Sequence, residues 1–275
     1  MRVLISADLE GVSGIVHPIE TNPEGYDYER GRALMTAEVN AAIAGVLDAD
    51  PAAEIRVADA HGTFRNLLPE DLDRRALLVR GKPRPWGMLQ GLDERTDAVF
   101  LVGYHGRAGS GPAVLAHTFS DAILDVRIAG RSFGEIGLNA ALAGHFGAPV
   151  ALLSGDDTAC AELRDLVPAA TTVQVKLAIG QSAAVALHPG EARERLRRAS
   201  AEATARHDRV PPFVLPGPIE VEVDLYGPYS VDLATLVPGM SRGAGARTVG
   251  FTAAGFDEAY RLILLLVQLA SIKPG

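Results

Sequence analysis

The sequence contains a single cysteine, Cys160, among 275 residues, which excludes a disulfide bond within the chain. A chain without disulfides is typical of a reducing compartment, so we expect a cytoplasmic protein. Aromatic residues make up only 5% of the chain, too few to favour the base-stacking platforms that bind single-stranded nucleic acids. Positive charge is also scarce, because 26 Lys and Arg stand against 34 Asp and Glu, a formal net charge of −8. This balance argues against nucleic acid and anionic membranes as partners.

No hydrophobic run is long enough to span a lipid bilayer. The most apolar one, LILLLVQLA at 262–270, is interrupted by Gln268, and we interpret it as a helix of the core. The opening segment MRVLISADLEG has too short an apolar stretch for the core of a signal peptide. Hydrophobic residues still make up 48% of the sequence, which is enough for a sizeable core. We therefore expect a globular protein without a membrane partner.

The sequence does show an alternation of short apolar runs with helical patterns. The apolar runs are typical of buried strands; they lie at 2–7, 54–60, 76–81, 98–105, 123–128 and 149–157. Apolar residues at helical spacing follow at 28–49 and from about 134 to 146. This alternation predicts an α/β fold, with a mostly parallel sheet and helices on both of its faces.

In the last third of the chain, predicted strands again alternate with predicted helices, on a smaller scale. The segment IEVEVDL at 219–225 alternates apolar and acidic residues, as a half-exposed strand does. A further strand is expected at 248–254 and a helix at 256–270. The prediction is a metal-binding α/β domain at 1–168 that carries the active site, and a smaller α+β domain at 169–275 for oligomerisation or for lining a channel.

Residues that bind divalent metals follow several of the predicted strands. Carboxylate oxygens and imidazole nitrogens are the ligands that such ions take in proteins. The carboxyl ends of parallel strands meet at one edge of a sheet, so these groups can converge there. The candidates are Asp8 and Glu10 after the first strand, Asp59 and His61 after the second, His105 at the end of the strand VFLVGY, and Glu135 at the start of a helix.

Each of these residues also has an ordinary structural interpretation. Asp8 and Glu10 suit a turn or a helix cap, and His105 suits a hydrogen-bonded core histidine. Glu135 suits the first turn of a helix. The hypothesis of a metal site depends on their coincidence at three strand ends. His117 is the last residue of the glycine-rich segment GRAGSGPAVLAH. The pattern is consistent with a histidine that lies over the site and equally with one that is exposed to solvent.

The motifs together resemble the zinc D-aminopeptidases of peptidase family M55. The resemblance extends along the chain; its most specific segments are SADLEG (6–11), ADAHG (58–62), FLVGYHGRA (100–108), HTFS (117–120) and GEIGLNA (134–140).

The resemblance implies a role for each candidate. Asp8 is implied to bridge two zinc ions, with Glu10 and Glu135 completing the ligands of one ion and His61 and His105 those of the other. His117 is implied to be the principal catalytic residue, as a nucleophile or as an acid–base group. The family also forms ring-shaped decamers, so a homo-oligomer is expected.

The function predicted from these motifs is that of a two-metal aminopeptidase. Its substrates would be short peptides, from which it releases N-terminal amino acids of the D configuration. Two alternatives stay open at this point. One is a metal-dependent amidase or another small-molecule hydrolase, and the other is a metal-binding scaffold protein without catalytic activity.

Overall fold

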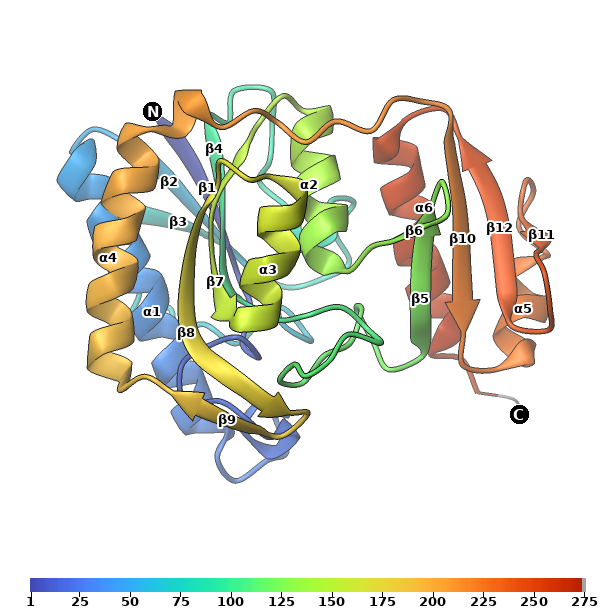
Figure 1. Ribbon diagram of the computed structural model, residues 1–275, viewed down its shortest axis with the longest axis horizontal. Helices are drawn as coiled ribbons and strands as arrows, with labels where there is room; N and C mark the ends of the chain where they lie inside the picture. The colour runs from blue at the N-terminus through green and yellow to red at the C-terminus, as the bar shows by residue number, and fades with distance from the viewer. Residues whose placement is uncertain (274–275) are drawn as a thin grey trace.

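The structure, a computed structural model, describes residues 1–273. Two sheets lie beside each other with helices between them (Figure 1). The larger sheet has the strand order β3 (Ala76–Val79), β2 (Glu54–Asp59), β1 (Arg2–Ala7), β4 (Ala98–Tyr104), β7 (Val150–Asp156), β8 (Thr171–Gly180) and β9 (Ala183–Ala186). Neighbouring strands are parallel except at the edge, where β9 runs antiparallel to β8.

Helices cover both faces of this sheet, as the sequence predicts (Figure 1). One face carries α1 (Tyr28–Ala49) and α4 (Pro189–Ala205), and the other carries α2 (Glu135–His145) and α3 (Asp157–Leu166). Every residue of β4 and of β7 is buried. Strands that are covered on both faces need apolar side chains at every position, which explains their continuous hydrophobic runs.

The smaller sheet is antiparallel throughout, and Figure 1 shows it at the opposite end of the molecule from α1 and α4. Its order is β11 (Ser241–Arg242), β12 (Thr248–Ala253), β10 (Ile219–Leu225), β5 (Ile123–Ile128) and β6 (Arg131–Ser132). Helix α6 (Phe256–Ala270) packs between this sheet and α2, and α5 (Pro228–Ala234) packs against α6. Three short 3-10 helices lie at Pro18–Glu20, Gly87–Leu89 and His207–Arg209.

Each of the two sheets contains strands from both sides of the boundary that we expected at 168/169. Residues 171–205 form β8, β9 and α4 of the larger sheet, whereas 123–132 form β5 and β6 of the smaller one. The smaller sheet therefore takes its strands from both parts of the chain, and the division into two domains stays a prediction. Its strand β10 alternates buried residues with exposed or partly exposed ones, because one face of this sheet is only partly covered.

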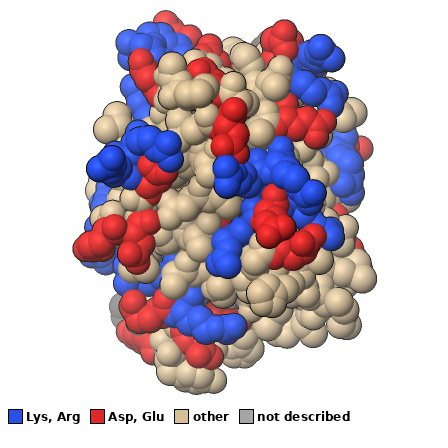
Figure 2. Space-filling model, turned by 90° about the vertical axis from the view of Figure 1, so that its left-hand side faces the viewer, with Lys and Arg blue, Asp and Glu red and all other residues tan. Residues whose placement is uncertain are grey.

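The surface formed by α4 and α1 carries charges of both signs. Figure 2 shows basic and acidic side chains interspersed over this face. Arg197 of α4, for example, pairs with Asp48 of α1 through Nε and Oδ2 at 2.6 Å. Among residues 1–273, no helix has both the length and the apolar character that crossing a bilayer requires.

Candidate metal centre

The five predicted metal ligands come together at one edge of the larger sheet. Strand β1 lies between β2 and β4, with Ala7 paired to Asp59 on one side and to Val102 on the other. The carboxyl ends of the three strands are thus neighbours. Asp8 follows β1 directly, His105 follows β4 directly, and His61 lies two residues beyond β2. Glu10 lies in the loop after β1, and Glu135 is the first residue of α2.

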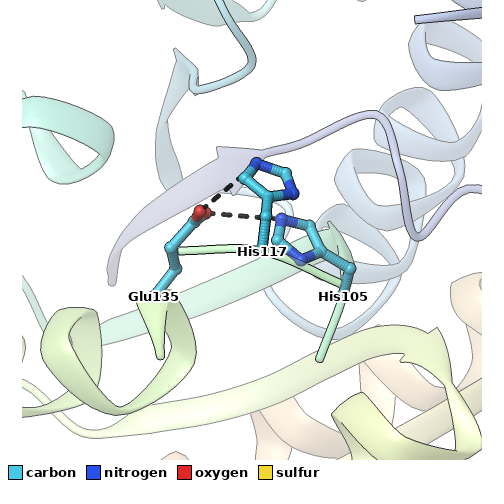
Figure 3. Close-up of side chains that lie close together, drawn as sticks. All are labelled: His105, His117 and Glu135. Atoms are coloured by element: carbon cyan, nitrogen blue, oxygen red, sulfur yellow. Dashed lines mark ion pairs between the residues drawn. The ribbon is translucent and has the colours of Figure 1, made fainter. Parts of the chain in front are cut away.

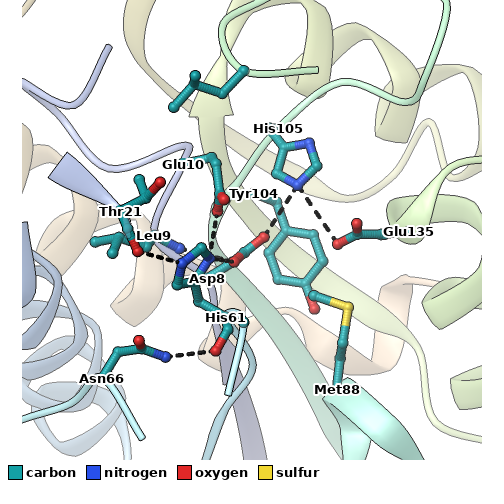
Figure 4. A network of polar contacts seen from close by, with 12 residues as sticks. Asp8, Leu9, Glu10, Thr21, His61, Asn66, Met88, Tyr104, His105 and Glu135 are labelled. Carbon is teal, nitrogen blue, oxygen red and sulfur yellow. Dashed lines mark hydrogen bonds and ion pairs between the residues drawn. The ribbon is translucent and has the colours of Figure 1, made fainter. Parts of the chain in front are cut away.

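Asp8 lies at the centre of this cluster (Figure 4). Its Oδ1 is 3.4 Å from Nδ1 of His61, and its Oδ2 is 3.3 Å from Nε2 of His105. A further carboxylate accompanies each imidazole. Glu10 Oε2 lies 2.9 Å from Nδ1 of His61, and Glu135 Oε2 lies 3.6 Å from Nε2 of His105. The two oxygens of Asp8 therefore face two separate groups of ligand atoms.

Backbone carbonyls fix the orientation of the histidine rings. Nε2 of His61 donates to the carbonyl of Thr21 at 2.9 Å, and Nδ1 of His105 donates to that of Gly106 at 3.0 Å. A carbonyl oxygen only accepts, so these nitrogens carry the protons. The opposite nitrogen of each ring then faces the carboxylates. Histidines that bind metals are usually held in this way through their second nitrogen.

Two buried atoms of the cluster have no hydrogen-bond partner among the described residues. They are Oδ2 of Asp8 and Nε2 of His105. Nε2 of His105 lies 3.3 Å from Oδ2 of Asp8 and 3.6 Å from Oε2 of Glu135, so these three atoms form a triangle. Ligands about 2.1 Å from a tetrahedral zinc ion lie roughly 3.4 Å from one another. The three atoms thus fit a shared cation, and such an ion would compensate the buried polar atoms that lack partners.

The charges in the cluster shift the pKa values of its members. Burial disfavours the imidazolium forms of His61 and His105, but the carboxylates beside them outweigh it and raise both pKa values well above the usual range. Burial and the neighbouring Glu10 raise the pKa of Asp8. For Glu10 and Glu135, burial is outweighed by the histidines, which lower both pKa values. The carboxylates of this site therefore strongly favour positive charge beside them.

His117 reaches the same site from the loop after β4 (Figure 3). Its ring stacks on that of His105 with centroids 4.2 Å apart. Nδ1 of His117 donates to the carbonyl of Leu115 at 2.8 Å, while its Nε2 lies 3.7 Å from Oε1 of Glu135. That oxygen also accepts a hydrogen bond of 2.6 Å from the backbone N–H of Phe119. The side chain of His117 is 22% exposed, so it is open to a bound molecule.

Two glycines allow the loop with Asp8 and Glu10 to lie directly on β4. Gly11 donates its N–H to the carbonyl of Gly103 at 2.7 Å, and Gly103 has a φ of 74°. A Cβ atom on Gly11 would collide with the carbonyl of Tyr104, and one on Gly103 would collide with that of Asp8. The glycine of the SADLEG segment is thus required for the close approach of these two backbones.

Lys176 of β8 supports the same loop, and the sequence analysis did not identify it. Its buried ammonium group donates to the carbonyls of Glu10 at 2.5 Å, Val12 at 3.0 Å and Ile15 at 2.7 Å. A lysine in a strand that otherwise alternates is normally interpreted as solvent-exposed. Nothing in the local sequence shows that a loop more than 160 residues away covers it.

Two further acidic residues near the strand ends have structural roles. Asp156 caps α3 by accepting from the N–H of Ala159 at 2.7 Å, and aspartate is among the residues preferred at this position. Asp59 accepts from the backbone N–H groups of Asn66 at 2.5 Å and of Leu67 at 2.7 Å. It shapes the loop that follows His61 and is not a member of the cluster.

A buried set of carboxylates and backbone-anchored imidazoles at the strand ends defines an α/β metalloenzyme. The comparisons with known proteins agree. The model of peptidase family M55, D-aminopeptidase, matches residues 1–265. The D-aminopeptidase of Bacillus subtilis (strain 168) is 35% identical over 270 residues, 98% of each chain.

Among solved structures, the Zn-dependent D-aminopeptidase DppA from Bacillus subtilis, described as a self-compartmentalizing protease, is similar over the full length of both chains. Its TM-score is 0.96 and its sequence identity 33%. The chain therefore belongs to the M55 family of metallopeptidases and is a D-aminopeptidase.

Proposed function

We propose that this enzyme releases N-terminal D-amino acids from short peptides with the help of two zinc ions. The Bacillus relative is Zn-dependent, and the two groups of ligand atoms around Asp8 supply places for two cations. The observation that carries the proposal concerns the two oxygens of the Asp8 carboxylate. Oδ1 lies 3.4 Å from the imidazole of His61, and Oδ2 lies 3.3 Å from that of His105.

The contacts support a grouping of ligands that differs from the one implied by the resemblance. Glu10 lies beside His61, and Glu135 lies beside His105. We therefore assign Glu10 and His61 to one ion and Glu135 and His105 to the other, with Asp8 between them. Three carboxylates and two neutral imidazoles against two divalent ions leave a net charge of about +1.

Bound metal ions in such a site supply a polarised substrate carbonyl and an activated water. The chain itself supplies orientation and proton transfer. Nδ1 of His117 is protonated because it donates to the carbonyl of Leu115, so its Nε2 is free to face the substrate. We assign His117 the acid–base role: its Nε2 would take a proton from the attacking water and pass it to the leaving amine. A neutral imidazole is a weak nucleophile toward a peptide when a metal-activated water is available.

We further propose that the enzyme is a homo-oligomer, and by family resemblance a decamer. The relative is a self-compartmentalizing protease, which requires several copies around an enclosed space. The β8–β9 edge of this chain offers apolar contact area, since Leu177 is 48% exposed, Ile179 64% and Val185 61%. Short peptides would enter such an enclosure and folded proteins would not.

The proposal is tested with four substrates, each with zinc and with a chelator. They are D-Ala-D-Ala, L-Ala-L-Ala, N-acetyl-D-Ala-D-Ala and casein. We expect rapid zinc-dependent release of D-alanine from the first alone. Acetylation removes the positive charge and the lone pair of the amino terminus, so the acetylated peptide should react poorly. Equal rates on the free and acetylated peptides would point to an amidase or another hydrolase. No turnover of any substrate would favour a metal-binding scaffold.

A further inference from the structure

A cavity of about 660 Å³ opens beside the metal centre. It lies between the segment 62–87 and one side of α6. Its lining includes Gly62, which follows the predicted ligand His61, and Phe119, whose N–H donates to Glu135. Two residues of the lining are thus direct neighbours of predicted ligands, Gly62 in the sequence and Phe119 through a hydrogen bond. None of the five ligands and not His117 lines it, so the reaction described above does not account for it.

The walls of the cavity combine apolar surface with positive charge. Leu264 and Val267 of α6 face Phe64 across it, and Lys82 and Arg84 lie beside them. Neither cation has a carboxylate oxygen within 4.0 Å among residues 1–273. Arg261, the third cation of the lining, already pairs with Asp257 at 3.1 Å. The two positive charges thus make no ion pair within 4.0 Å in this partly apolar space, and the charge of Asp59 acts on Arg84 only from a greater distance.

Arg84 is held rigidly in this position. Its Nη2 donates to the carbonyl of Asp59 at 2.6 Å and its Nη1 to that of Val79 at 3.2 Å. The guanidinium lies over the ring of Phe64, 3.9 Å from the centroid. Its Nε is buried and has no hydrogen-bond partner among the described residues. Burial lowers the pKa of Arg84 to about 10, so the group remains charged at neutral pH.

The two phenylalanines of the cavity have unusual backbone conformations. Phe64 has a φ of 60° and Phe119 a φ of 59°. A bulky residue in the left-handed region costs about 1–3 kcal/mol and persists only where its surroundings demand it. Such positions cluster at ligand sites. Both rings are thus placed at the cavity by strained backbone rather than by relaxed packing.

We propose that Arg84, together with Lys82, binds the C-terminal carboxylate of a short peptide whose N-terminal bond lies at the metal centre. This inference rests on the proposed function and adds the part of the substrate that the function leaves undefined. Two extended residues span about 7 Å, so the carboxylate of a dipeptide falls close beside the reacting bond. The apolar wall of α6 and Phe64 would contact the side chain of the last residue. An unpaired arginine is well suited to a carboxylate.

The wild-type metal-loaded enzyme provides the first test, through D-Ala-D-Ala and its C-terminal amide, D-Ala-D-alaninamide. Both offer the same scissile bond and free amine, and they differ only in the terminal charge. We expect kcat/KM to be about 10–100-fold higher for the acid, mainly through KM, because a charge-assisted hydrogen bond is lost in the amide. Equal values for the two substrates would overturn the carboxylate site while leaving the peptidase intact. Failure of the enzyme on both would instead refute the proposed function.

Substitutions of Arg84 and Lys82 test whether these residues cause the difference in kcat/KM between the acid and the amide. Arg84→Gln should bring the acid-to-amide ratio of kcat/KM close to 1. Lys82→Gln, at an exposed position, should lower the ratio by about 3–10-fold even if Arg84→Gln fails to fold. Arg195→Gln is the matched control, because it also removes one arginine charge but lies on the opposite face of the larger sheet. It should keep the wild-type acid-to-amide ratio. An unchanged ratio in both cavity variants, or an equal loss of activity on both substrates, would overturn the proposal and favour a cavity that a second copy of the chain fills.

Discussion

The imidazole rings of His105 and His117 stack with their centroids 4.2 Å apart and an angle of 13° between their planes. His105 cannot rotate, because its Nδ1 donates to the carbonyl of Gly106 and its ring is buried. The stacked ring of His117 is therefore held in a fixed plane, with its Nε2 beside Glu135. A proton-transfer group needs such a fixed position next to the reacting bond.

Replacement of His117 separates a catalytic role from metal binding. We expect His117→Ala to keep both metal ions and to lose about 10²–10⁴-fold in kcat, as for a lost acid–base group. Metal content is measured by elemental analysis and kcat with D-Ala-D-Ala. His188→Ala, at the N-terminus of α4, is the matched control and should match the wild type. Loss of a metal ion from His117→Ala would instead make His117 a ligand.

The grouping of the ligands is tested by metal content in double variants. Asp8→Ala should lose both ions, because Asp8 faces both groups. Glu10→Ala with His61→Ala should keep one ion, since these two residues serve the same ion in our assignment. Under the grouping implied by the resemblance, this double variant would damage both sites. Retention of about one ion per chain therefore supports the assignment, and near-complete loss contradicts it.

The candidate site was predictable because its signals are local. Asp8 and His105 directly follow strands whose continuous apolar runs identify them as buried and parallel. A parallel sheet places such ends along one edge, and the order β2-β1-β4 makes these three ends neighbours. Glu135 follows from the same logic, since it begins the helix α2 that packs on this edge.

The remaining features depend on pairings that the sequence does not encode locally. The apolar run at 123–128 predicts a buried strand, yet only the structure shows that it pairs with 219–225, as β5 and β10 of the antiparallel sheet. Lys176 becomes buried and Arg84 partly buried because distant segments cover them. Residue type alone predicts exposure for both, and tertiary packing overrides it.

Lys176 provides a test of how the loop with Glu10 is held. Lys176→Met keeps a side chain of similar length but leaves the carbonyls of Glu10, Val12 and Ile15 without their donor. We expect the free energy of unfolding to fall by at least about 3 kcal/mol, because each unpaired buried carbonyl costs about 1–3 kcal/mol. Urea unfolding measures the loss. The exposed Lys273→Met is the control, and an equal, small change in both variants would contradict the role of Lys176.

Glu38 of α1 should make stability depend on pH. Its Oε1 accepts from the N–H of Ser13 at 2.8 Å, while its Oε2 is buried without a partner. Burial raises the pKa of Glu38 from 4.5 to about 7, although the charges of Lys176 on β8 and Arg193 on α4 lower it. Between these two pKa values the folded chain binds more protons than the unfolded chain. The contribution of Glu38 to stability is thus fully present below pH 4.5 and is lost as the pH rises through 7.

The variant Glu38→Gln removes this dependence, because glutamine still accepts from Ser13 and does not ionise. Relative to the wild type, we expect it to gain up to about 3 kcal/mol between pH 5 and pH 8, measured by urea unfolding at each pH. The metal centre is common to both proteins, so its own titration cancels in the difference. Glu29→Gln, at an exposed position of the same helix, should show no such gain. If the stability curves of wild type and Glu38→Gln run parallel from pH 5 to pH 8, Glu38 does not change its ionisation in that window, and the buried carboxylate must be compensated by Lys176 more strongly than its raised pKa implies.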